Sequence, residues 1–225
     1  MRLVDLAVEL RFKGNATLLK DDVRTTLIKE FDPDYLKNKK TQELNFVQIR
    51  PKDKRVAITA QENRYGVAIQ DKNVKRAMQK INQYITTINK LINYTDLDIA
   101  RLGVKTVWVH KCGKDISQLK NTFKEKFYKD NKIVSNSIDY AAVLTLHDKD
   151  FTVAYTAGPI EKNEPIPVSF SVSGLDEANV FVATDYFQVN SKAIKLAPLL
   201  ELIDTAVLSG EQKAKDTVEI LEVSL

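Results

Sequence analysis

Two kinds of hydrophobic periodicity alternate along this chain, and they do so twice in a similar order. Segments with an apolar residue at every second position are typical of half-buried strands, and segments with apolar residues three or four positions apart are typical of amphipathic helices. Residues 1–93 read strand, helix, three strands, helix, and residues 98–208 read strand, helix, four strands, helix. This order predicts an α+β fold.

The first half of the chain contains the strongest helix signal. From Asn73 onward, apolar residues repeat at spacings of four and three, which predicts a long helix with one buried face. The stripe consists of Val74, Met78, Ile81, Ile85, Ile88 and Ile92. Before it we expect a strand over 3–12, a helix over 17–31, a Lys- and Asn-rich loop over 35–42, and strands over 43–50, 55–61 and 64–70.

The second half repeats the pattern. Residues 98–110 predict a central strand, because the segment is apolar on both faces near its end. Asp115, followed three residues later by Gln118, predicts a helix that opens with a capping box. We then expect strands over 137–147, 151–159, 166–173 and 178–189, and a helix over 191–208 that Gly210 terminates.

These elements define two pseudo-repeated β-α-β(3–4)-α halves, over 1–95 and 96–210, with a charged C-terminal tail over 211–225. The halves either fold separately or join into one composite domain. Joined, they predict a mainly antiparallel sheet with helices packed on one face and the other face open. This order of elements resembles the TATA-binding-protein-like fold, which implies a duplicated unit and a binding surface on the sheet.

Two short segments resemble the paired strand signatures of a sporadically distributed family of uncharacterised bacterial proteins. They are Ala7-Val8-Glu9-Leu10-Arg11-Phe12 and Arg101-Leu102-Gly103-Val104-Lys105. The resemblance implies a bacterial or phage origin. Because the role of that family is itself unknown, the resemblance implies nothing about chemistry.

Composition excludes several classes of protein. One cysteine, Cys112, cannot form an internal disulfide, and together with two histidines it offers too few ligands for a closed zinc site. The N-terminus lacks the apolar core of a signal peptide, and no apolar run is long enough to span a membrane. Glycines are scattered singly, so no phosphate-binding glycine loop is present. We therefore expect a cytoplasmic protein without cofactor, metal or membrane partner.

Charge is distributed unevenly. Residues 37–90 contain thirteen Lys or Arg against four acidic residues, a net charge of +9, whereas residues 160–225 have a net charge of −6. The basic segment predicts a nucleic-acid contact surface, with Tyr65 stacking on a base. The candidate residues are Arg50, Lys52, Lys54, Arg55, Arg64, Tyr65, Lys72, Lys75, Arg76 and Lys80. The alternatives are a solvated surface, or attraction between the two halves of the chain.

Two groups of residues invite a catalytic or metal interpretation. His110 and Cys112 point the same way along a strand, but no acidic residue or oxyanion signature accompanies them. His147, Asp148 and Asp150 could bind a cation, although Asp is expected in a hairpin turn for its backbone geometry alone. We assign no catalytic and no metal-binding residue from the sequence.

Three functions follow in order of preference. The first is a non-enzymatic binding or assembly module that acts on a protein partner, or on a second copy of itself, through an exposed sheet face or edge. The second is a nucleic-acid-binding accessory protein that uses segment 37–90. The third is an enzyme with an unrecognised site.

Overall fold

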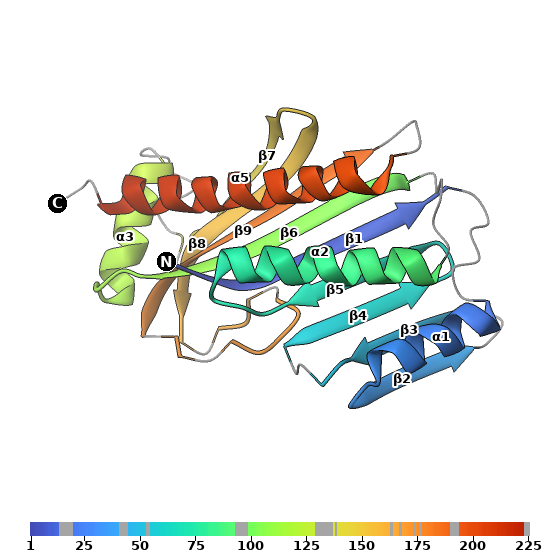
Figure 1. Cartoon of the computed structure of the whole chain (residues 1–225). Helices are drawn as coiled ribbons and strands as arrows, with labels where there is room; N and C mark the ends of the chain where they lie inside the picture. The colour runs from blue at the N-terminus through green and yellow to red at the C-terminus, as the bar shows by residue number, and fades with distance from the viewer. Residues whose placement is uncertain are drawn as a thin grey trace.

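The structure of the chain is a computed structural model that describes residues 1–13, 20–40, 45–52, 55–92, 99–128, 137, 139–162, 164–166, 168–172, 174–175, 177–189 and 194–222. Within this part of the chain, one nine-stranded sheet is covered on one side by helices (Figure 1). The strands are β1 (Arg2–Phe12), β2 (Tyr35–Lys40), β3 (Asn45–Arg50), β4 (Val56–Gln61), β5 (Arg64–Ile69), β6 (Ile99–Lys111), β7 (Ala142–Asp148), β8 (Phe151–Glu161) and β9 (Ala178–Val189). The helices are α1 (Asp21–Phe31), α2 (Val74–Leu91), α3 (Ile116–Phe127) and α5 (Leu196–Glu222).

The strand order is β2-β3-β4-β5-β1-β6-β9-β8-β7, and each neighbouring pair is antiparallel. The first strands of the two halves, β1 and β6, pair at the centre of the sheet. The strands of the first half continue to one side and those of the second half to the other, so a single sheet runs through both halves. The predicted α+β class, with helices packed on one face of an antiparallel sheet, is confirmed.

The main core lies between the sheet and the helices. Inward residues of β1, such as Leu6, Val8 and Leu10, are buried because they alternate toward the helix layer. The predicted stripe of α2 supplies Ile81, Ile85 and Ile88 to the same core. The capping box predicted for α3 is present, since the Asp115 carboxylate accepts from the backbone N–H of Gln118 at 2.8 Å.

Two predicted elements are wrong. Residues 35–40 form strand β2 rather than a loop, because a lysine-rich segment is well suited to a sheet edge, where charge is tolerated. The described residues of 166–173 do not form a strand. Pro165 directly precedes that segment, and Ile166, Val168 and Val172 alternate because they pack on the sheet from outside.

The last helix also differs from its prediction. It begins at Leu196 and runs through Gly210 to Glu222, so that most of the segment predicted as a tail is helical. Gly210 does not end the helix. A Cβ atom there would lie 2.7 Å from Oγ1 of Thr106 and 2.8 Å from Oγ1 of Thr184, so glycine lets α5 approach β6 and β9 closely. The predicted residues 17–19, 43–44 and 191–193 lie outside the described part of the chain.

Candidate functional site

The face of the sheet opposite the helices is open over part of its area. We call it the open face. A cover segment, made of the described residues of 164–175, packs Ile166, Val168, Val172 and Leu175 against Val4, Val107, Val109 and Ala183. Ser169 anchors it, donating from its backbone N–H and its hydroxyl to Asp5 at 3.1 Å each. Beside this segment, no residue in the described part of the chain covers the open face over β4, β5, β1 and β6.

A hollow of about 410 Å³ lies on this uncovered area. Its floor is made of small residues from four neighbouring strands, namely Ala7, Ala57, Gly66, Ala68 and Gly103. The register brings them together, since Glu9 lies opposite both Gly66 and Gly103, and Ala7 lies opposite Ala68. Small side chains leave the backbone close to the surface, so a ligand can approach the sheet itself.

A row of three arginines borders the floor. Arg64 on β5, Arg11 on β1 and Arg101 on β6 are direct cross-strand neighbours, because Arg11 lies opposite both of the others. Like charges placed directly opposite on neighbouring strands destabilise a sheet. We call this set the arginine row. Three guanidinium groups gathered at one place mark the row as a candidate anion-binding element.

Local contacts hold the arginine row in place. Glu9 lies 2.6 Å from Nε of Arg11 and 3.5 Å from Nη1 of Arg64, so one carboxylate serves two guanidinium groups. Nε of Arg64 also donates to Gln61 at 2.6 Å. Arg101 lies over the ring of Phe187, with 4.7 Å from Cζ to the ring centroid. These contacts orient the three side chains and leave them partly exposed.

Further charges lie on the same face. Lys105 and Asp185 line the hollow and are cross-strand neighbours. Asp5 is fully buried under the cover segment, and this burial raises the pKa of its carboxyl, although the Ser169 hydrogen bonds and Lys105 act in the opposite direction. Toward β2 and β3, Arg50 lies over Tyr35 at 5.4 Å and over Phe170 at 6.0 Å, and Lys37 lies over Phe46 at 5.6 Å.

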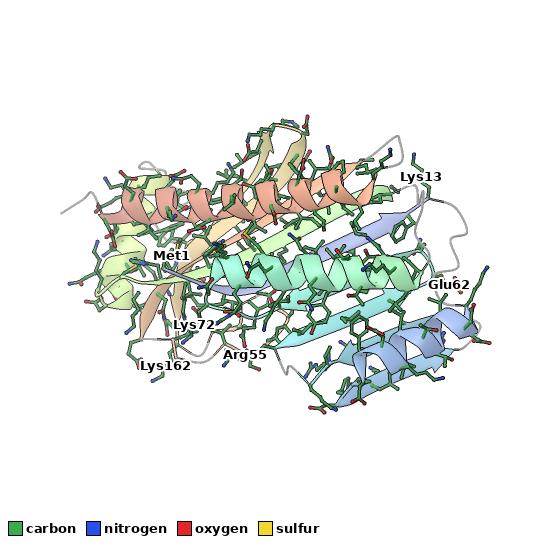
Figure 2. The ribbon with its side chains drawn as sticks, viewed as in Figure 1. Met1, Lys13, Arg55, Glu62, Lys72 and Lys162 are labelled. Atoms are coloured by element: carbon green, nitrogen blue, oxygen red, sulfur yellow. The ribbon has the colours of Figure 1, made fainter. Side chains whose placement is uncertain are left out.

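The basic residues singled out in the sequence do not share one surface. Arg64 lines the hollow and Arg50 lies against Phe170 of the cover segment, whereas Lys54 lies outside the described residues. Lys52 pairs with Asp32 at 2.5 Å. Arg55 and Lys72 lie together at one end of the sheet (Figure 2), where both line a small depression. Lys75, Arg76 and Lys80 belong to α2, in the helix layer, and Arg76 is held by Asp71 at 2.5 Å.

Tyr65 cannot stack on a base as predicted. Its side chain is only 2% exposed and lies under the helices, where its hydroxyl donates to Asn89 at 2.7 Å. The reason is the strand period, because Tyr65 and Arg64 are consecutive residues of β5 and therefore point to opposite faces. The aromatic rings available on the open face are instead those of Tyr35, Phe46 and Phe187.

The enzyme-like residues occupy structural positions. Nε2 of His110 lies 2.9 Å from Glu222 of α5, and the Cys112 thiol contacts the His110 carbonyl rather than its imidazole. Burial raises the pKa of that thiol, the opposite of an activated nucleophile. Asp148 is bound by Lys213 at 3.0 Å and accepts from the Tyr186 hydroxyl at 3.2 Å. Among the described residues, no three His, Cys, Asp or Glu side chains gather at a potential metal site.

Arg11 and Arg101 are the functional candidates that sequence reasoning missed. Both were present in the two segments quoted for the bacterial family resemblance, and those segments pair along β1 and β6. The signal that could have found them is the strand period. It puts Ala7, Glu9 and Arg11 on the same face of one strand, and Arg101, Gly103 and Lys105 on the same face of another.

Comparison with known proteins adds little. No protein-family model matches the chain, and no curated protein matches it. Among solved structures, Methanococcus jannaschii TBP aligns with 91% of this chain and 97% of that chain, with 12% sequence identity and a TM-score of 0.34. Nothing about the function of this chain follows from so distant a match. The membership of the bacterial family stays a prediction. No helix in the described residues is both long and apolar enough to cross a membrane.

Proposed function

We propose that this protein is a non-enzymatic binding module that binds nucleic acid across the open face of its sheet. The observation that carries the proposal is the arginine row, in which Arg64, Arg11 and Arg101 stand side by side on three neighbouring strands above a floor of glycine and alanine. Arginine forms bidentate hydrogen bonds with phosphate, and three of them in line match a phosphate backbone.

An anionic ligand also explains why the row exists. The residues lining the hollow include four cations and two acids, so the site has a net positive charge. Glu9 neutralises part of the charge of Arg11 and Arg64, and the lining as a whole keeps two positive charges in excess. A phosphate placed among the three arginines would interact favourably with that excess charge.

The extent of the basic surface favours a polymer over a small anion. Arg101 on β6 and Arg50 on β3 are separated by four strand spacings. At about 4.8 Å for each spacing, the cations span about 19 Å, more than one nucleotide can cover. Tyr35, Phe46 and Phe187 lie along the same face and offer rings on which unpaired bases can stack. We therefore expect a preference for single strands.

A fluorescence anisotropy titration tests this function. Labelled single-stranded DNA and RNA oligonucleotides and a duplex are titrated at several salt concentrations, with wild type and the triple variant Arg11→Gln, Arg64→Gln, Arg101→Gln. We expect the variant to lose at least about tenfold in affinity, and its slope of log K against log salt to fall by about 2, which corresponds to three lost phosphate contacts on a single strand.

The matched control removes the same charge elsewhere. Lys29, Lys72 and Lys75 are exposed and lie outside the hollow, so replacing all three with Gln should leave most of the affinity in place. Equal losses in both triple variants would contradict a site on the open face. Absence of binding at low salt, or full competition by a mononucleotide, would contradict nucleic acid as the ligand.

A second function, binding of a protein partner through a sheet edge, is favoured by a different observation. Exposed large apolar residues lie on both edge strands, with Tyr35 and Leu36 on β2 and Val143 and Leu144 on β7. An added strand would slow amide hydrogen exchange along one edge. Fast exchange at both edges, with candidate partners present and at high protein concentration, would contradict this second function.

A further inference from the structure

The two edges of the sheet differ in charge. Edge strands present unpaired backbone N–H and C=O groups, and native proteins usually protect them with charged residues. Three of the six residues of β2 are lysines, so that edge has the usual protection. Strand β7 has the sequence Ala-Val-Leu-Thr-Leu-His-Asp, with no lysine, arginine or glutamate.

The unprotected edge also exposes apolar surface. The side chain of Val143 is 72% exposed and that of Leu144 is 47% exposed, and Thr145 beside them is exposed as well. Among the residues whose burial the structure describes, no large apolar residue is more exposed than Val143 except Val189, at the end of β9. A strand with free backbone groups, exposed apolar side chains and little charge is suited to pairing with another strand.

We infer that β7 pairs with β7 of a second copy of this chain, antiparallel and around a two-fold axis. This inference names the partner for the proposed edge function and does not depend on nucleic-acid binding. Full overlap of the seven-residue strand puts Thr145 on the axis, opposite Thr145 of the second copy. Leu144 then lies opposite Leu146, Val143 opposite His147, and Ala142 opposite Asp148.

The charges on the strands favour this pairing over the alternatives. In this register no charged residue of β7 meets a like charge, and Asp148 is already neutralised within its own chain by Lys213 at 3.0 Å. Pairing of β2 with β2 would instead collect six lysines on one short ladder. Pairing of β2 with β7 would be head-to-tail and would not close, whereas the two-fold contact forms a closed dimer.

The dimer joins the two sheets edge to edge. A two-fold axis through Thr145, perpendicular to the sheet, keeps both helix layers on one side and both open faces on the other. The hollow lies over β4, β5, β1 and β6, several strands away from β7, so pairing leaves it uncovered.

Sedimentation velocity of the full chain tests the inference. We expect wild type at micromolar concentrations to sediment as a species of twice the 25.5 kDa chain mass. Thr145→Lys and Thr145→Glu each place two like charges on the axis, so each variant should sediment with the mass of one chain. A mixture of the two should return to the dimer mass, because lysine then faces glutamate.

A matched control separates the edge from the face. Ala154 lies directly opposite Thr145 on β8 and is exposed, so Ala154→Lys adds the same charge one strand away from the edge and should leave the dimer intact. A monomeric wild type, a dimer that survives both Thr145 variants, or a mixture that stays monomeric would overturn the inference. Circular dichroism checks that each variant is folded. Oligonucleotide binding by the monomeric variants is measured in a separate titration.

Discussion

Gly210 offers the sharpest test of how the last helix meets the sheet. The residue is buried in the middle of α5, where alanine would ordinarily stabilise a helix by about 1 kcal/mol. Here a Cβ atom would lie 2.7 Å and 2.8 Å from the hydroxyl oxygens of Thr106 and Thr184. Both hydroxyls are fully buried and hydrogen-bonded to each other at 2.7 Å, and the Thr106 oxygen also accepts from Nε1 of Trp108 at 2.8 Å.

These contacts determine how much Gly210→Ala should change the free energy of unfolding. Either α5 moves away from β6 and β9, or the threonine hydroxyls rotate and their hydrogen bonds weaken. Overpacking a well-packed core costs about 2 kcal/mol, and a weakened buried hydrogen bond costs about 1 kcal/mol. After subtracting the helix gain of about 1 kcal/mol, we expect the free energy of unfolding to fall by about 2 kcal/mol.

Urea unfolding followed by tryptophan fluorescence is the assay, because Trp108 is the single tryptophan and contacts this site. The urea concentration at the midpoint of unfolding should fall, and the m-value should stay unchanged. Glu219→Ala, at an exposed position of the same helix, should change the free energy by no more than about 0.5 kcal/mol. In a Thr184→Ala background, which opens space, Gly210→Ala should cost less. A Gly210→Ala protein as stable as wild type, or more stable, would refute the reasoning.

Two further predictions concern stability. The Arg76 guanidinium holds the pKa of the Asp71 carboxyl below its ordinary value of 3.8, and Asp71 is only 3% exposed. Because that pKa is lowered, the pair stabilises the fold above pH 3.8, and this stabilisation is lost as the pH falls below that value. In urea titrations, Arg76→Gln should therefore lower the free energy of unfolding by about 1 kcal/mol at pH 7 and by progressively less toward pH 3. An equal loss at both pH values would contradict this prediction. Asp115→Ala removes the α3 capping box and should lower the free energy of unfolding, measured by thermal unfolding, by about 1 kcal/mol. Asp115→Asn keeps a side-chain oxygen and should melt like wild type. Equal melting temperatures of the two variants would show that the cap does not act through its oxygen.

The types of element were predictable where the periodicity is strong. The isoleucine stripe of α2, the alternation of β1 and the capping box of α3 are local patterns, and each occurs where it was expected. The wrong predictions fall on segments whose sequence pattern is compatible with two kinds of structure. The cover segment alternates like a strand but contains prolines, and β2 has the composition of a loop but the position of an edge.

The candidate site was far less predictable. Arg11 and Arg101 are ninety positions apart in the sequence and become neighbours only because β1 pairs with β6 in one register. Local charge density along the chain selects the basic residues of 50–80 and passes over Arg11 and Arg101, which belong to the two central strands. Charge density along a chain does not show which face of a sheet the helices cover.

By itself the sequence determined most of the strands and helices, since hydrophobic period and capping act over a few residues. It also determined that Arg64 and Tyr65 point to opposite faces, because the strand period is two. Only the tertiary structure decided which of them is buried, which strands are neighbours, and that Gly210 is a contact point rather than a helix end. These depend on helices and strands far apart in the chain packing together, and no local pattern records that packing.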